Sequence, residues 1–157
     1  MKEYNELITV CMVSFHSDKI IKKILKIIPK KYQIIVTDNA ITESLKNDLE
    51  NSFENVKVII PKNNLGNGGG VNFALKIINT KYALYLDVDT EFDENTIDKL
   101  VKIANANTGW AIIAPNLENY IYKVDLEILG GEVICSVTED RALEDNSKSI
   151  LMRTKVK

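Results

Sequence analysis

The stretch YALYLDVDTEFDENTIDKL, from Tyr82 to Leu100, joins a short apolar run to several acidic residues. The run from Tyr82 to Leu86 consists almost wholly of large apolar side chains, which is typical of a buried strand. Asp87 and Asp89 follow it directly, one residue apart. Because residues two apart on a regular strand point the same way, we expect both carboxylates to face the same space.

Further strands and helices alternate on both sides of this stretch. The predicted strands are apolar runs over residues 7–15, 32–38, 56–60, 81–89 and 109–117. The predicted helices cover residues 17–29, 42–52 and 93–106, and a further amphipathic helix follows a glycine-rich turn within residues 61–80. Ser17 or Asp18 can cap the first helix, and Thr42 can cap the second. This alternation predicts an α/β fold with a mostly parallel sheet flanked by helices.

The pattern weakens after residue 119. Residues 120–134 predict a hairpin with a bend at Gly130, residues 138–149 a polar loop, and residues 150–157 a last short strand. Since the chain contains no internal repeat and no convincing linker, we predict a single domain over residues 1–157. Its core covers residues 1–118, and residues 119–157 form a less regular extension.

The composition is that of a soluble globular protein with one hydrophobic core. The chain has 157 residues, of which 45% are hydrophobic and 27% charged. With a formal net charge of -2, the chain lacks the excess of basic residues that nucleic-acid-binding proteins carry, so we expect no nucleic-acid partner. Cys11 and Cys135 are far apart and form no C-x-x-C pattern, which argues against a disulfide scaffold or a zinc site.

The cysteine usage and the N-terminal residues favour a cytoplasmic protein. Reduced cysteines are the rule in the cytoplasm. The first residues form neither a secretory signal nor a membrane span, which needs about 20 apolar residues. Peripheral attachment to the inner face of a membrane, through a segment outside this chain, stays open.

Polar residues follow four of the predicted strands and converge on one edge of the sheet. In an open parallel sheet, ligands bind at the carboxyl ends of the strands, near the point where the strand order reverses. The residues that we expect at this edge are Ser14, Phe15, His16, Asp38, Asn39, Asn64, Gly66, Asp87 and Asp89.

The glycine-rich segment NNLGNGGGVNFAL, at residues 63–75, fits no standard phosphate-binding fingerprint. It follows the third strand, whereas the G-x-G-x-x-G dinucleotide motif follows the first, and no G-K-[S/T] completes a P-loop. Two interpretations stay open. The glycines either form a tight turn with close helix packing, or let the backbone approach a ligand at a helix N-terminus.

Asp38 and His16 each have a structural and a binding interpretation. Asp38 either stabilises a turn or accepts hydrogen bonds from a nucleobase or a ribose. His16 is the only histidine, and nothing in the sequence supplies a second imidazole or a nucleophile for it. We interpret it first as a structural residue and second as a nucleotide contact.

Asp87 and Asp89 can hold a divalent cation. Mg²⁺ and Mn²⁺ take oxygen ligands, often one or two carboxylates completed by water and a substrate phosphate. The alternative is a solvated strand end that leads into a helix cap. The position after the fourth buried strand favours the cation site.

The chain resembles the nucleotide-sugar-binding half of a family 2 glycosyltransferase with the GT-A fold, and most of all the rhamnosyltransferase-like branch. The order and spacing of the motifs agree across roughly residues 7–118. The motifs that carry the resemblance are VSFH at 13–16, VTDNA at 36–40, NNLGNGGGVNFAL at 63–75, LYLDVDT at 84–90 and AIIAPNL at 111–117.

The resemblance implies a role for most of the candidate residues. The main chain near Ser14, Phe15 and His16, together with the Asp38 carboxylate, would hold the nucleobase and ribose. Asp89 would bind Mg²⁺ or Mn²⁺ directly, and Asp87 would reach the ribose or the cation through water. The donor pocket would also be shaped by Asn64, Gly66 and Asn72.

The resemblance also implies the reaction. The donor would be a UDP- or dTDP-linked sugar, the acceptor a saccharide or a lipid-linked saccharide, and the product part of a bacterial surface polysaccharide. The sugar would be transferred with inversion, while a base deprotonates the acceptor hydroxyl. A nucleotidyltransferase is disfavoured. That class of enzyme normally has a basic glycine-rich loop directly after the first strand, whereas the corresponding turn here, SFHSDKI, contains no glycine.

Two departures from the family pattern affect these expectations. His16 stands where the family has asparagine. The family continues into an acceptor-binding half with an acidic base, which we expect to lie beyond residue 157. Asp140, within TED at 138–140, is the one candidate base in this chain. An inert nucleotide-sugar-binding or assembly module is therefore the alternative, and homodimerisation through uncovered apolar residues is expected.

Overall fold

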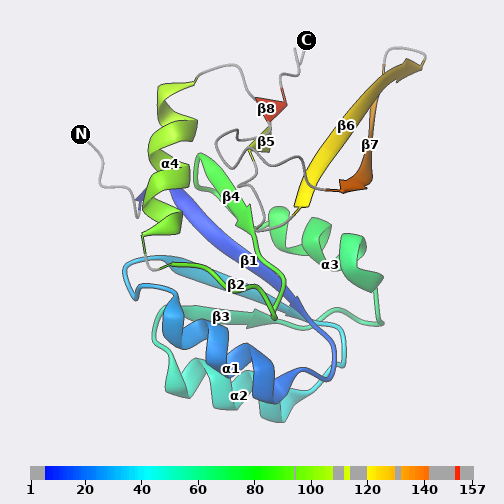
Figure 1. The fold of residues 1–157 in the computed structure, drawn as a ribbon. Helices are drawn as coiled ribbons and strands as arrows, with labels where there is room; N and C mark the ends of the chain where they lie inside the picture. The colour runs from blue at the N-terminus through cyan, green and yellow to red at the C-terminus, as the bar shows by residue number, and fades with distance from the viewer. Residues whose placement is uncertain are drawn as a thin grey trace. The chain divides into compact units, whose positions relative to one another are not determined.

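The computed structural model describes residues 6–93, 95–107, 112–113, 120–129, 132–141 and 151–152. The chain divides into two compact units, Met1–Val101 and Lys102–Lys157. The first unit contains a parallel sheet and its helices, and the second contains two antiparallel strand pairs (Figure 1). The sequence predicts one domain over both units, and that assignment stays a prediction.

Four parallel strands form the sheet of the first unit, in the order β3-β2-β1-β4. The strands are β1 (Ile8–Ser14), β2 (Gln33–Asp38), β3 (Val56–Ile59) and β4 (Tyr82–Tyr85). The helices are α1 (Asp18–Ile27), α2 (Glu43–Ser52), α3 (Gly66–Leu75) and α4 (Thr96–Ala106), of which α4 continues into the second unit. The predicted α/β fold with a parallel sheet flanked by helices is confirmed.

The apolar residues of β1 and β2 are buried because helices cover both faces of the sheet, whereas β4, which we expected to be buried, is only partly buried at the edge of the sheet. Val10 and Met12 of β1 pack into the larger core cluster, which also contains apolar residues of α1, α2 and α4. Cys11, which points the other way, packs into a smaller cluster with residues of α3. Cys11 is buried, and burial raises the pKa of its thiol to about 11.

The strand order places the reversal point between β1 and β4. The chain moves from β1 to β2 and then to β3 on one side of the sheet, and β4 pairs with the opposite side of β1. In Figure 1, α1 and α2 lie on one face of the sheet and α3 on the other. The loops that follow β1 and β4 therefore leave the sheet at the position where open α/β sheets bind ligands.

The predicted strand over residues 81–89 is too long. β4 ends at Tyr85, and Leu86 still donates its N–H to the Cys11 carbonyl at 3.1 Å. The chain then turns, because the Thr90 N–H bonds to the Asp87 carbonyl at 3.1 Å. Asp87 and Asp89 therefore lie in a turn after the strand, and the strand geometry does not orient their side chains.

The expected glycine-rich turn is largely helical. α3 begins at Gly66, so Gly68, Gly69 and Gly70 lie in its first turns. Among these four glycines, Gly66 alone has a positive φ, of 68°, which a non-glycine residue adopts rarely. Gly70 lies where α3 approaches β1 most closely, since a Cβ built on it would be 2.9 Å from one methyl of Val13 and 3.0 Å from the other.

The cap positions of α1 and α2 are confirmed, but their side chains do not cap. Ser17 and Thr42 are the N-cap residues, and neither makes a side-chain cap hydrogen bond. The Ser17 hydroxyl bonds to that of Ser14 at 2.8 Å instead. The Thr42 N–H donates to the Asp38 carboxylate at 2.8 Å, so a residue before the helix takes the capping role.

The second unit corrects two expectations. We predicted a fifth strand of the mostly parallel sheet over residues 109–117, whereas β5 (Ile112–Ile113) lies outside the four-stranded sheet and pairs antiparallel with β8 (Leu151–Met152). The predicted hairpin is confirmed as β6 (Tyr120–Leu129) and β7 (Glu132–Arg141). β7 also includes residues 138–141, predicted to be a loop, because the start of β6 supplies backbone partners for them. None of the helices within the described ranges is long and apolar enough to span a bilayer.

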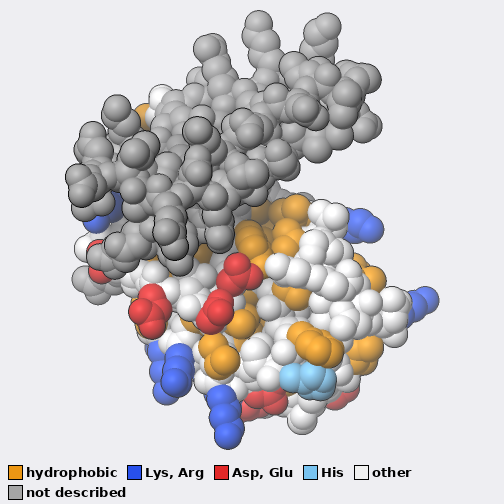
Figure 2. Space-filling model, turned by 45° about the vertical axis from the view of Figure 1, so that its right-hand side comes forward, with side chains coloured by type: hydrophobic (Ala, Val, Ile, Leu, Met, Phe, Trp, Pro, Cys, Tyr) orange, Lys and Arg blue, Asp and Glu red, His pale blue; other side chains and the backbone are white. Residues whose placement is uncertain are grey.

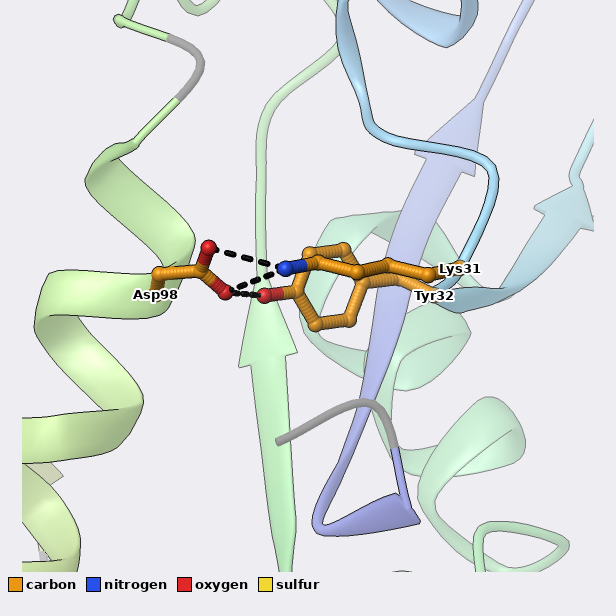
Figure 3. Close-up of polar contacts among 3 residues, drawn as sticks. All are labelled: Lys31, Tyr32 and Asp98. Carbon is orange, nitrogen blue, oxygen red and sulfur yellow. Dashed lines mark hydrogen bonds and ion pairs between the residues drawn. The ribbon is translucent and has the colours of Figure 1, made fainter. Parts of the chain in front are cut away.

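A polar contact attaches the start of α4 to the start of β2. The Lys31 ammonium donates to both Asp98 oxygens at 2.8 Å, and the Tyr32 hydroxyl donates to one of them (Figure 3). Burial would raise the pKa of Asp98, but the hydrogen bonds from Lys31 and Tyr32 and the charge of Lys31 hold it below its usual value. Burial, helped by the bond to Asp98, raises the pKa of Tyr32 above its usual range.

We expect Tyr32→Phe to lower the free energy of unfolding by about 1 kcal/mol, the net value of a typical hydrogen bond. The Tyr32 ring is fully buried and phenylalanine keeps its packing, so the hydroxyl alone is removed. Urea denaturation at pH 7 measures the loss. Tyr82→Phe is the matched control, because within the described part of the chain the Tyr82 hydroxyl makes no hydrogen bond.

The stabilities of wild type and Tyr32→Phe should converge at high pH. Because the folded state holds the Tyr32 proton more tightly, this contribution is fully present below the unfolded pKa of about 10 and is lost as pH rises above it. The stability difference between wild type and Tyr32→Phe should therefore shrink above about pH 10. A constant difference up to pH 11 would contradict the role given to the hydroxyl.

Two glycine substitutions in α3 should have opposite effects. Gly70→Ala forces a methyl against Val13, and we expect it to cost about 1–3 kcal/mol, as overpacking typically does. Gly68→Ala meets nothing within 4 Å, and we expect a gain of about 0.5–1 kcal/mol from the restricted unfolded chain. Urea denaturation compares the two, and equal stabilities would refute the close packing of α3 on β1.

Candidate functional site

The ends of β1 and β2 lie side by side at the carboxyl edge of the sheet. Ser14 and Asp38 are register partners, and the Asn39 N–H donates to the Ser14 carbonyl at 2.8 Å. Both Ser14 and Asp38 are fully buried. The sheet therefore brings these two predicted site residues together, below the loops that leave the edge.

The Asp38 carboxylate stabilises the loop that leads into α2. One oxygen accepts the Ala40 N–H at 3.1 Å and the other accepts the Thr42 N–H at 2.8 Å. Asp38 therefore stabilises a turn, which is the first of its two predicted roles. Each carboxylate oxygen has a second lone pair, so the nucleobase or ribose contact stays a prediction.

This loop contains a strained residue. Ile41 has a φ of 58° and is 46% exposed, although a β-branched side chain disfavours the left-handed region. The Ile41 N–H bonds to the Asp38 carbonyl at 3.3 Å, which closes the turn. The loop therefore presents an apolar side chain to solvent beside the carboxyl edge of the sheet.

Phe15 and His16 form an exposed aromatic pair after β1. Their ring centroids are 4.3 Å apart with the planes tilted by 56°. His16 has a φ of 52°, so the chain turns sharply there before α1. Phe15 is 55% exposed, which leaves a face of the pair free for a planar ligand. Their roles in nucleotide binding stay predictions.

Asn39 connects the end of β2 to the start of α3. Its side-chain oxygen accepts the Leu65 N–H at 3.2 Å, and its side-chain nitrogen donates to the Gly66 carbonyl at 2.9 Å. The Asn64 side-chain oxygen accepts the Gly66 N–H at 2.8 Å. These bonds place the positive-φ glycine and the first turn of α3 at the same edge as Asp38.

The acidic turn after β4 completes the set of predicted residues at this edge. Asp87 and Asp89 are both exposed, and Figure 2 shows acidic side chains on the face that also carries the histidine. The Tyr85 hydroxyl donates to one Asp87 oxygen, whereas Asp89 makes no hydrogen bond or ion pair within the described residues. Burial, together with the Asp87 contact, raises the pKa of Tyr85 to about 12.

The donor set at this turn fits a hard divalent cation in part. Carboxylate oxygens are suitable ligands for Mg²⁺ or Mn²⁺. Among residues 6–93, 95–107 and the other described segments, no group of three or more acidic, histidine or cysteine residues could hold a metal ion. A cation at Asp87 and Asp89 would therefore need water or ligand oxygens to complete its coordination.

Besides Asp89, two predicted residues are not brought into contact with the others. Asn72 is exposed on α3 and makes no hydrogen bond within the described part of the chain. Asp140 lies in β7 opposite Ile121 and belongs to the second unit. The roles of both stay predictions.

The sequence reasoning missed the parts played by Asn67 and Tyr85. The Asn67 amide lies 2.8 Å from the Tyr85 hydroxyl, which in turn contacts Asp87. A tyrosine two residues before Asp87, in a run of apolar residues, is the signal that points to this contact. Asn67 has no comparable signal, because asparagine is common in such turns.

Comparison with known proteins identifies the family. The family model described as glycosyl transferase family 2 matches residues 9–143, well over half of the chain. A search of curated proteins found no match. The parallel sheet flanked by helices agrees with the GT-A fold that the motifs led us to expect. The chain therefore belongs to glycosyltransferase family 2.

Proposed function

We propose that this chain binds a nucleotide-diphosphate sugar at the carboxyl edge of its parallel sheet and takes part in transfer of the sugar to a saccharide acceptor. The family implies a nucleotide-sugar donor and an acceptor in general terms. The observation that carries the proposal is the convergence at one edge of the β1 end, the Asp38 loop, the start of α3 and the acidic turn.

The nucleoside would lie beside the ends of β1 and β2. The exposed Phe15 and His16 rings offer a surface for a planar base. Ser14 directly precedes Phe15, and Asp38 is the register partner of Ser14 on β2. Asn64 and Gly66 would form a neighbouring wall, and Asn72 would contact the donor from farther along α3. The N–H groups at the start of α3 favour negative charge nearby.

The diphosphate would bind near Asp87 and Asp89 through Mg²⁺ or Mn²⁺. Asp89, which no described side chain engages, is the proposed direct ligand. Asp87 would reach the ribose or the cation through water. When bound, the cation neutralises charge on the diphosphate leaving group.

The proposed reaction is a direct displacement with inversion at the anomeric carbon. The acceptor hydroxyl oxygen forms the new glycosidic bond as the bond to the diphosphate breaks, and the hydroxyl proton passes to a carboxylate base. Asp140 is the candidate base in this chain. The motifs further support the rhamnosyltransferase-like branch, with a dTDP- or UDP-linked donor and a bacterial surface polysaccharide as product.

Calorimetric titration with UDP and dTDP, with and without Mn²⁺, tests donor binding. We expect binding that requires Mn²⁺, and we expect Asp89→Asn to weaken it by at least about tenfold, as loss of a charged contact does. Asp93→Asn is the matched control, because it removes an exposed carboxylate four residues away. Absence of Mn²⁺-dependent binding in the wild type would refute the proposal, as would equal affinities of wild type and Asp89→Asn.

Turnover separates the enzyme from an inert binding module. We expect the wild-type chain with Mn²⁺ to release nucleoside diphosphate from a dTDP- or UDP-sugar, with or without a saccharide acceptor, and Asp89→Asn to abolish the release. Chromatography measures the nucleoside diphosphate that is released. Binding without any release, in the presence of acceptor saccharides, would favour the alternative of a module that retains the fold without turnover.

A further inference from the structure

Three side chains from two elements form a continuous hydrogen-bonded chain at the rim of the site. Asn67 lies in the first turn of α3, Tyr85 is the last residue of β4, and Asp87 lies in the turn that follows. The Asn67 side-chain nitrogen is 2.8 Å from the Tyr85 hydroxyl oxygen, and its side-chain oxygen is 3.0 Å from it. The hydroxyl also contacts an Asp87 carboxylate oxygen.

The chemistry of the groups sets the direction of these bonds. A phenol has one proton to donate, and a carboxylate is an acceptor only. The bond to the charged carboxylate is the stronger choice, so the Tyr85 proton goes to Asp87. The hydroxyl oxygen then accepts an N–H from Asn67, which fixes the orientation of that amide.

Tyr85 is the rigid member of this chain. Its ring packs against the smaller core cluster with Cys11, Ala74 and Val71, between the sheet and α3. Its backbone pairs with Cys11 in the parallel ladder. Asn67 and Asp87 are both exposed, and Tyr85 is the residue that engages the Asp87 side chain within the described part of the chain.

We propose that Tyr85 is a positioning residue that orients the Asp87 carboxylate for the donor and, through Asn67, holds the start of α3 at a fixed distance from the acidic turn. With one Asp87 oxygen occupied by the phenol, the other is directed to the ligand. The inference rests on the proposed donor site.

Titration of UDP or dTDP with Mn²⁺ tests Tyr85→Phe. We expect the dissociation constant to rise about 10–100-fold, the size of effect expected when a hydrogen bond to a charged group is lost. Tyr82→Phe, the same substitution in the same strand, should bind like the wild type. Asn67→Ala should weaken binding less, and adding it to Tyr85→Phe should have little further effect, because the residues act as one chain.

Amide hydrogen exchange gives a second readout that needs no ligand. Tyr85→Phe should accelerate exchange in residues 87–90 and in the first turn of α3, whereas Tyr82→Phe should not. Unchanged exchange in both segments would overturn the inference. Wild-type binding with an unchanged dissociation constant in Tyr85→Phe would overturn it while leaving the proposed function in place, whereas absence of wild-type binding would refute the proposed function itself.

Discussion

The parallel pairing of β1 with β2 on one side and β4 on the other is the constraint on which the candidate site depends. Register places Ser14 beside Asp38, and Cys11 beside Tyr85, so β1 continues past the end of β4. The connection after β1 leads to β2 on one side of β1, whereas β4 pairs with the other side of β1. At such a reversal of the strand order, the loops after β1 and β4 are not covered by the same crossover helix. Polar residues far apart in the sequence therefore meet at one edge.

The loops at this edge are held by side chains that bond to backbone groups. Asp38 satisfies two N–H groups of its own loop, and Asn39 satisfies an N–H and a carbonyl at the start of α3. A buried carboxylate is costly unless it is hydrogen-bonded, and here the two bonds offset that cost. Thr37 adds a bond from its hydroxyl to the Gly70 carbonyl at 2.9 Å. These bonds fix α3 relative to β2 more closely than apolar packing alone would.

The fold was predictable where burial alone decides it, and the site was predictable only as a location. Runs dominated by apolar residues gave β1, β2 and β3 almost to the residue, because strands covered on both faces are mostly apolar. The end of β4 was misplaced, since Leu86 and Val88 look like strand residues although the chain already turns at Asp87. The helical state of Gly68–Gly70 was missed because the intrinsic propensity of glycine opposes it. Of the three, Gly70 packs closely against Val13. Side-chain contacts such as Asn67 with Tyr85 depend on a spacing of 18 residues and leave no periodic signal.

The departure of Asp87 and Asp89 from the strand changes what the two acids can do. On a strand, both side chains would be oriented by the pleat, whereas in an exposed turn each must be oriented by a contact or remain free to rotate. Tyr85 supplies such a contact to Asp87, and within the described residues Asp89 has none. An oriented carboxylate loses little entropy on binding a ligand, and a free one can adjust to the near-octahedral geometry that Mg²⁺ requires. If the pair binds a cation as proposed, Asp87 is the carboxylate already oriented by a contact, and Asp89 is the one that no described side chain engages.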